Sequence, residues 1–226
     1  GTDVLSLSYR DSLNMVTATY FVDYRSLNKN IMDNSYLYDN QLNNDYKGLS
    51  GSYKGQYHIG QFVYQRYQGK NLFNAKLEYR KSPGAQKYSQ SLNLANRDET
   101  TNNRKLTSDM SSISTDLYYD HTFVRGNNLS VNVLNTFYTS KSDNMLESTS
   151  SSYSFKNNIN NKSYSLIAEL LYADKLWKGN LQLGAYYQFK NLKQTNSDVD
   201  VSRINTQKQY VYMDYNNQVG LFSYDI

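Results

Sequence analysis

The chain has 226 residues, with 24 basic and 20 acidic side chains and no cysteine. Its length suits one large all-β unit or two small domains, and the lack of cysteine excludes disulfides and thiolate metal sites. The charges are mixed along the sequence without a basic stripe, which argues against nucleic-acid binding, because contacts to phosphates need clustered Lys and Arg.

Alternation of apolar and polar residues predicts strands along most of the chain, because successive side chains of a strand point to opposite faces. In chain order, the predicted apolar faces are Leu5, Leu7 and Tyr9; Val16, Ala18, Tyr20 and Val22; Phe73, Ala75, Leu77 and Tyr79; Leu117, Tyr119 and Phe123; Leu129, Val131, Val133 and Phe137; Tyr164, Leu166, Ala168, Leu170 and Tyr172; and Leu181, Leu183, Ala185, Tyr187 and Phe189. Residues 53–67 follow the pattern less cleanly, and it continues through 209–217. We therefore predict an all-β fold, an antiparallel meander of about ten long strands.

The opposite faces of these strands carry charged and amide side chains. In a membrane barrel the apolar faces would meet lipid and the polar faces a wet lumen, whereas in a soluble sandwich they would meet the core and water. Several patterns continue for roughly ten residues, which favours membrane strands, which need about nine to eleven, over globular strands of about five or six. The barrel hypothesis predicts these lumen-facing residues: Asp116, Asp120, Glu169, Gln182 and Gln188.

Short polar turns and long polar loops separate the strands. Tight turns are predicted at Asp11–Asn14, Gln68–Asn71, Arg125–Asn128, Trp177–Asn180 and Gly220–Phe222. Long loops rich in Asn, Ser, Thr and Lys are predicted at 28–48, 82–108 and 143–160, and the single proline, Pro83, at a strand-to-loop junction. Short turns on one rim and long loops on the other are typical of outer-membrane barrels. Loops of this length are unusual in a compact soluble domain.

Five phrases near the C-terminus share an order and spacing with a known family. NKSY at 161–164 leads into LIAEL at 166–170, KLWKGNLQLG follows at 175–184, and YVYMDY at 210–215 precedes GLFSY at 220–224. With these phrases, residues 155–226 resemble the Bacteroidetes outer-membrane β-barrel family, akin to TonB-dependent receptors. The resemblance implies a location in the outer membrane of a Gram-negative bacterium. It also implies energy-coupled uptake or surface binding of a large nutrient.

Members of that family carry a plug domain before the barrel and have more strands. No plug and no energy-coupling segment is recognisable in this sequence, and the chain stops within a predicted strand. We therefore expect residues 1–226 to form a single β-barrel domain that is a section of a larger barrel. Open strand edges would pair with the missing parts of the parent barrel or make the isolated chain an oligomer.

Candidates for catalysis or metal binding are few. The sequence has two histidines, His58 and His121, and Asp120 cannot pair locally with its neighbour His121, because their side chains lie on opposite faces of a strand. Asp116 and Asp120 share a face and could act as an acid–base pair or bind a hard cation, but a polar lumen wall explains them better. The segment 198–200 lacks the further ligands of a calcium loop. We predict no enzymatic activity, no cofactor and no metal site.

The first long loop contains Tyr36, Tyr38 and Tyr46. These rings would suit stacking against a glycan or peptide, although an aromatic-rich polar loop without a ligand is the alternative. The primary hypothesis is a section of an outer-membrane β-barrel transporter or receptor. Its partners would be outer-membrane lipid and a glycan, peptide or other nutrient. The alternative is a soluble, exported β-sandwich for binding or adhesion, in the periplasm or secreted.

Overall fold

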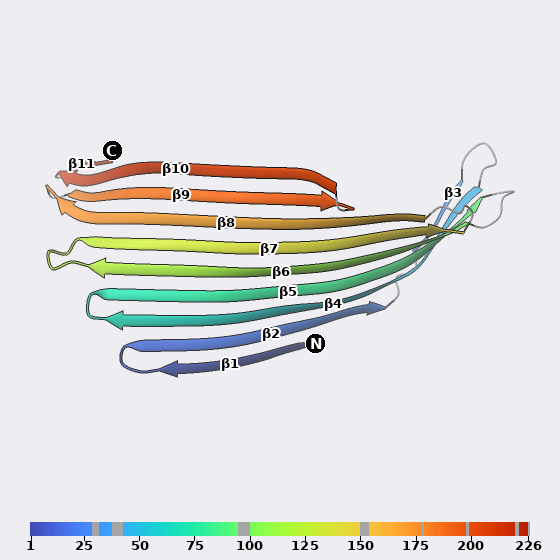
Figure 1. The fold of residues 1–226 in the computed structure, drawn as a ribbon, viewed down its shortest axis with the longest axis horizontal. Helices are drawn as coiled ribbons and strands as arrows, with labels where there is room; N and C mark the ends of the chain where they lie inside the picture. The colour runs from blue at the N-terminus through green and yellow to red at the C-terminus, as the bar shows by residue number, and fades with distance from the viewer. Residues whose placement is uncertain are drawn as a thin grey trace.

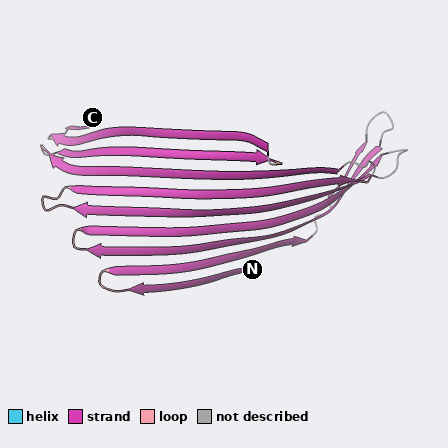
Figure 2. Ribbon diagram, viewed as in Figure 1, coloured by secondary structure: helices cyan, strands magenta, loops and turns pink. Residues whose placement is uncertain are grey.

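The computed structural model describes residues 1–28, 32–37, 43–94, 100–149, 154–177, 179–197, 199–219 and 222–225. These residues form eleven strands of one antiparallel sheet (Figures 1 and 2). The strands are β1 (Thr2–Arg10), β2 (Asn14–Asn28), β3 (Met32–Leu37), β4 (Asn43–Gln68), β5 (Asn71–Leu94), β6 (Thr100–Thr122), β7 (Asn128–Ser148), β8 (Ser154–Leu176), β9 (Gly179–Asn196), β10 (Val199–Val219) and β11 (Phe222–Asp225).

The strands follow one another across the sheet in chain order, except that β3 pairs only with the first part of β4. This order confirms the predicted all-β meander. Five strands, β1, β4, β6, β8 and β10, run toward the rim on the left of Figure 1, which we call the turn rim. At the opposite, distal rim, β9 ends at Asn196 and β10 begins at Val199. Strands β4 to β8 extend further in this direction (Figure 1).

The tight turns lie at the turn rim, between the strands where they were predicted, although Lys178 of the fourth lies outside the described residues. In the first, the Asp11 carboxylate accepts hydrogen bonds from the backbone N–H groups of Leu13 and Asn14 at 2.8 and 2.7 Å. These bonds, that from Leu13 first, lower the pKa of Asp11 below its ordinary 3.8. In the second, Gly69 has a φ of 59°, which favours glycine. Gly220 and Leu221 of the fifth lie outside the described residues, but the flanking strands β10 and β11 pair.

The predicted long loops are largely wrong, because strands fill most of their length. Strands β3 and β4 occupy much of 28–48, β5 extends to Leu94 before β6 begins at Thr100, and β7 ends at Ser148 before β8 begins at Ser154. Polar side chains predominate on both faces of these stretches, which weakens the alternation that marks a strand. Backbone pairing continues without that signal, since it depends on N–H and C=O groups.

The predicted position of Pro83 at a strand-to-loop junction is also wrong. Pro83 lies inside β5 opposite Asp109 of β6. On its other side the pairs Gln56–Pro83 and Tyr57–Ser82 are missing from the β4–β5 ladder, although the register is the same before and after. Proline has no amide hydrogen to donate, so it is accommodated at an interruption of the ladder. Val199 and Asp200 begin β10, and Asp198 lies outside the described residues.

The sheet is a single layer. The chain exposes 16284 Å², whereas a compact protein of 26.2 kDa would expose about 10,600 Å². Among the described side chains, Val22 is the one buried apolar residue, and none is fully buried. A β-sandwich needs a second sheet packed against the first. The described strands form one sheet, so the sandwich architecture of the alternative hypothesis is wrong.

Candidate functional site

Cross-strand register gathers the predicted apolar faces onto one side of the sheet. Leu77, for example, lies in a row with Leu7, Ala18 and Phe62 across β1 to β5. We call this side the belt face and define the apolar belt by these members: Leu5, Leu7, Tyr9, Val16, Ala18, Tyr20, Phe62, Tyr64, Phe73, Ala75, Leu77, Tyr79, Ile113, Leu117, Tyr119, Leu129, Val131, Val133, Phe137, Tyr164, Leu166, Ala168, Leu170, Tyr172, Leu181, Leu183, Ala185, Tyr187, Phe189, Val211 and Met213.

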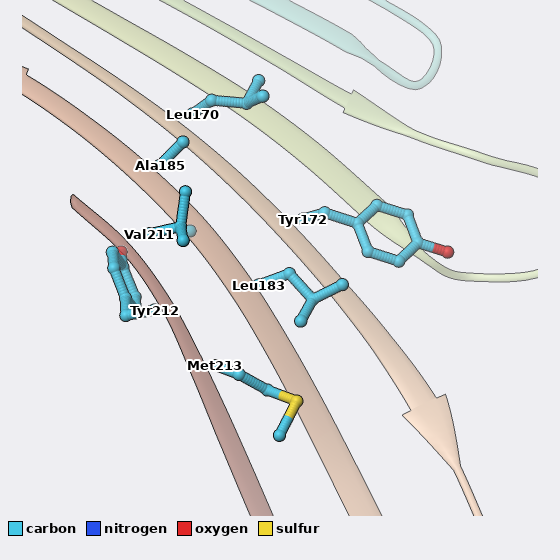
Figure 3. A pocket seen from close by; sticks show the side chains of 8 residues that line it. Leu170, Tyr172, Leu183, Ala185, Val211, Tyr212 and Met213 are labelled. Carbon is cyan, nitrogen blue, oxygen red and sulfur yellow. The ribbon is translucent and has the colours of Figure 1, made fainter. Parts of the chain in front are cut away.

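The belt is exposed. Leu7 is 66% accessible, Leu170 44% and Val211 82%. Over β8 to β10 the belt has a shallow depression of about 460 Å³ lined by Leu170, Leu183, Val211 and Met213, among others (Figure 3). Continuous apolar surface across this many strands is far more than a soluble monomer leaves open, and it marks a surface that contacts a membrane or another protein.

Tyrosines mark the edge of the belt nearest the turn rim, one on each strand that runs toward that rim. Their hydroxyls donate to polar groups at or near the turns: Tyr9 to Asp11 at 3.5 Å, Tyr64 to Asn14 at 3.0 Å, Tyr119 to Asn71 at 2.9 Å, Tyr172 to Asp174 at 2.8 Å, and Tyr215 to the Leu176 carbonyl at 3.1 Å. Each ring thus has an apolar body on the belt face and a polar tip toward the turns, which is the arrangement that suits an interface between an apolar phase and water.

Aromatic rings also mark the distal edge of the belt. Tyr20, Tyr79, Phe137 and Tyr164 lie in one row across β2, β5, β7 and β8, which we call the distal aromatic row. On β8 the belt runs from Tyr164 to Tyr172, which is nine residues. A strand that crosses a bilayer needs about nine to eleven.

The opposite side, the polar face, carries the five residues predicted to face a lumen. Register places Asp116, Asp120, Glu169, Gln182 and Gln188 all on this side, although it brings none of them into a cluster. Asp116 and Asp120 are four positions apart on an extended strand, roughly 13 Å. Asp120 accepts instead from Asn128 at 2.9 Å and Tyr118 at 3.2 Å. The two aspartates therefore do not form an acid–base pair.

Tyr212 of β10 also reaches across the polar face. Its hydroxyl donates to Glu169 of β8 at 3.1 Å, and its ring lies over Gly184 of the strand between them, where a Cβ would overlap it. An aromatic ring from a neighbouring strand is one way in which a sheet fills the space over a glycine. This contact links β8, β9 and β10 on the polar face.

The most buried charge on the polar face, Glu78, was not singled out from the sequence. Glu78 is 6% exposed, and its carboxylate accepts from Gln61 at 3.0 Å, Lys76 at 3.1 Å and Arg80. A buried carboxylate persists when such partners satisfy it. The alternating Lys76, Glu78 and Arg80 indicated a polar face, but burial depends on the neighbouring strands and is not visible in the pattern.

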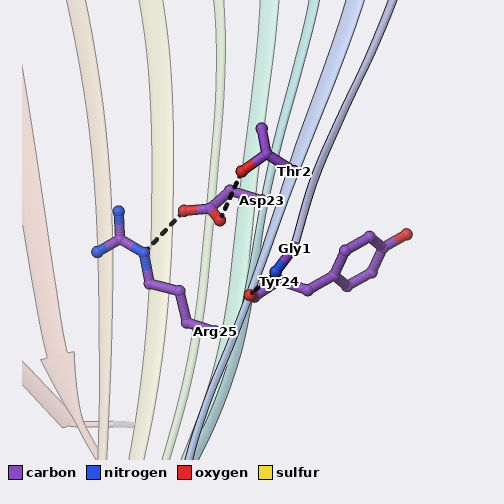
Figure 4. Close-up of polar contacts among 5 residues, drawn as sticks. All are labelled: Gly1, Thr2, Asp23, Tyr24 and Arg25. Atoms are coloured by element: carbon purple, nitrogen blue, oxygen red, sulfur yellow. Dashed lines mark hydrogen bonds and ion pairs between the residues drawn. The ribbon is translucent and has the colours of Figure 1, made fainter.

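A second ion pair lies on the polar face toward the distal rim. Asp23 accepts hydrogen bonds from Arg25 at 2.8 Å and from the Thr2 hydroxyl at 3.4 Å. Tyr24, which lies between Asp23 and Arg25 in the sequence, points to the opposite side of the sheet (Figure 4). Arg25, Tyr53, Tyr57 and Ser82, among others, line a polar cavity of about 250 Å³ here, next to the ladder interruption at Pro83.

The structure tests the proposed loop and histidine sites only in part. Tyr38 lies outside the described residues, and Tyr36 and Tyr46 belong to the paired strands β3 and β4, so their role in ligand binding stays a prediction. His58 contacts the Tyr20 hydroxyl at 2.7 Å, and His121 contacts Asn71 at 2.6 Å. Within the described ranges, no three His, Asp or Glu side chains converge as metal ligands.

No protein-family model matches the sequence, and no curated protein sequence is significantly similar to it, so membership of the Bacteroidetes family stays a prediction. Among the described residues there is no helix long and apolar enough to cross a membrane.

Solved structures with a similar arrangement of strands include outer-membrane receptors. The ferric preacinetobactin receptor BauA of Acinetobacter baumannii is 12% identical with a TM-score of 0.47, over 97% of this chain and 38% of that one. The siderophore receptor PiuA of the same organism is 10% identical with a TM-score of 0.43, over 95% and 42%. The alcaligin receptor FauA of Bordetella pertussis is 13% identical with a TM-score of 0.33, over 97% and 41%. This chain thus spans about two fifths of the length of each.

Proposed function

We propose that this chain is part of the wall of an outer-membrane β-barrel receptor or transporter of a Gram-negative bacterium. The apolar belt contacts lipid acyl chains, the polar face lines the lumen, and the strands beyond the distal aromatic row face the outside. The observation that carries the proposal is the belt on β8, whose nine residues begin and end with Tyr164 and Tyr172. Aromatic girdles at both edges of an apolar band are characteristic of membrane barrels.

The tyrosine hydroxyls favour lipid over a protein partner as the material that covers the belt. A protein interface has polar groups around its whole border, whereas a bilayer has two parallel planes where water begins. The five turn-side tyrosines follow such a plane, since each hydroxyl bonds to a group at or near the turns.

The lumen wall would consist of the polar face, with Asp116, Asp120, Glu169, Gln182 and Gln188 among its residues. The Glu78 network holds charged groups on that side, close to the centre of the strands that cross the membrane. We further propose that a longer parent protein completes the barrel and supplies energy-coupled uptake of a nutrient. Tyr36, Tyr38 and Tyr46 are the proposed ligand contacts, and we propose no catalytic role for the chain.

Leu170 and Leu171 offer a matched test, because they are neighbours on β8 that face opposite sides of the sheet. The chain has no cysteine, so Leu170→Cys and Leu171→Cys each give a unique position for a fluorescent label. In vesicles, we expect the label at 170 to be quenched by lipids brominated on their acyl chains, and the label at 171 by aqueous iodide. Equal quenching of both labels by either agent would refute the lipid-facing role of the belt.

A further inference from the structure

Basic residues follow the distal edge of the belt on the same side of the sheet. Lys81, Lys162, Lys193 and Arg203 lie in a single cross-strand row, with Ser111 and Thr139 filling the positions on β6 and β7. We call these four residues the basic row. It lies two positions beyond the distal aromatic row, because Lys81 follows Tyr79 on β5 and Lys162 precedes Tyr164 on β8.

The belt face stays basic beyond this row. Counted among the described side chains from the basic row to the distal rim, it carries nine cations and four carboxylates. The cations are Lys54, Lys81, Lys87, Lys105, Lys141, Lys156, Lys162, Lys193 and Arg203. The carboxylates are Asp3, Asp109, Asp143 and Glu147. Lys81 and Asp109 are 3.9 Å apart. The chain as a whole is only +4, so this excess alone accounts for its net charge.

The arrangement within the row is unfavourable for an isolated sheet. Lys162 lies directly opposite Lys193, and Lys193 directly opposite Arg203. The next basic pair outward, Lys87 and Lys105, is also directly opposite. Like charges at directly opposite positions destabilise a strand pair. An anion that bridges neighbouring strands would turn this repulsion into attraction.

The position of the basic row relative to the belt indicates which anion it would bind. In the proposed function, the distal aromatic row lies where the acyl chains end, so the basic row lies at the depth of the lipid headgroups. Lysine stems can lie along apolar surface while their ammonium groups reach the polar layer. At the turn-side edge, the belt face carries Arg66 and Asp174, which are of mixed sign. The charge excess is thus confined to the distal side.

We propose that the basic row binds phosphate groups of lipid headgroups in the leaflet at the distal side of the belt. Several phosphates on neighbouring lipids, or on one lipid with more than one phosphate, would each be shared by cations of adjacent strands. The inference rests on the proposed function, since the row meets headgroups only if the belt meets acyl chains.

The test uses two double variants of the chain that remove the same charge from opposite faces. Lys162→Gln with Lys193→Gln changes the basic row, and Lys190→Gln with Lys208→Gln changes the polar face of β9 and β10. Binding is measured to vesicles of phosphatidylcholine alone and of phosphatidylcholine mixed with phosphatidic acid. We expect phosphatidic acid to strengthen binding of the unaltered chain. In the first variant, affinity for the vesicles with phosphatidic acid should fall by about 30-fold, which is about fivefold per lysine. The second variant should keep the affinity of the unaltered chain.

The outcomes separate this inference from the proposed function. If the unaltered chain fails to insert into either vesicle, the proposed function fails. If it inserts but phosphatidic acid gives no gain, or both double variants lose the gain equally, the inference fails and the lipid-facing belt stands. If inorganic phosphate at millimolar concentration abolishes the gain, the row is a site for free anions and the lipid assignment is overturned. Circular dichroism of each variant checks that the sheet has formed.

Discussion

Leu170 and Leu171 are the same residue in adjacent positions of one strand, and they have different surroundings. Leu170 belongs to the apolar belt and is 44% exposed in a sheet with no second layer among the described residues. Leu171 lies on the polar face in a row with Ser130 and Gly184. The belt face has apolar side chains without a protein partner, and the polar face has polar side chains bonded to one another. The belt therefore depends on the surrounding medium, whereas the polar face is stabilised by its own contacts.

The largest effect is expected from a charged residue placed at the centre of the apolar belt. Ala168 lies midway between Tyr164 and Tyr172, so Ala168→Arg should destabilise the chain in a bilayer by about 2–4 kcal/mol. Arg at Ile167, its neighbour on the polar face, should cost much less. Denaturant unfolding in vesicles measures both. Moving the substitution to Tyr164, at the distal edge of the belt, should reduce the loss to about 0–1 kcal/mol. A flat profile along β8 would contradict the membrane assignment.

A smaller loss is expected on the polar face when Glu78 is neutralised. Breaking a buried ion pair costs about 3–5 kcal/mol. The side chains of Lys76 and Arg80 are 38% and 52% exposed, so solvent screening should reduce the loss for Glu78→Gln to about 1–2 kcal/mol. Asp214→Asn, on the same face and exposed, is the charge-matched control and should be close to neutral. If the two variants lose equal stability, the Glu78 network has no special role.

The edge of the belt should be sensitive to single hydroxyl groups. Tyr172→Phe removes a hydroxyl that donates to Asp174 at 2.8 Å and accepts from Asn127 at 2.9 Å, with an expected loss of about 1 kcal/mol. Tyr187→Phe lies in the interior of the belt on β9 and should not destabilise the chain in a bilayer. Unfolding midpoints in vesicles compare the two. The reverse ranking would mean that the hydroxyls do not mark a plane of water.

The smallest effect on stability is expected from protonation of Asp11 at the turn rim, outside the belt and the polar face. The hydrogen bonds to Asp11 hold its pKa below 3.8, so the carboxylate binds its proton less readily in the folded chain than in the unfolded one. Its stabilising contribution is therefore present above the unfolded pKa and is lost as the pH falls through the folded pKa. An NMR titration of the Asp11 side-chain carbon should show a midpoint below 3.8. A midpoint at or above that value would mean that the turn is not formed as described.

The sequence could predict the strands of the belt because two different environments act on their two faces. Alternation is strong at Tyr164–Tyr172 for that reason, and register then places the predicted faces together. The sequence predicts a loop over residues 82–94 and 100–108, because polar side chains predominate on both of their faces and the alternation is weak. Glu78 was missed because its burial comes from contacts between strands. The hydroxyl partners of the tyrosines depend likewise on which turn residues lie within reach.

The unequal extent of the strands at the distal rim has a consequence for how this chain can vary during evolution. Strands β9 and β10 end soon after the basic row, whereas β4 to β8 continue well past it (Figure 1). Between the aromatic edges, selection should act on every second residue of a strand, since only one face must stay apolar. In the continuing parts of β4 to β8, polar side chains predominate on both faces, and selection should act mainly on backbone pairing. These extensions should therefore diverge fastest, and in the proposed orientation antibodies or other agents that approach from solution would meet the most variable part of the wall first.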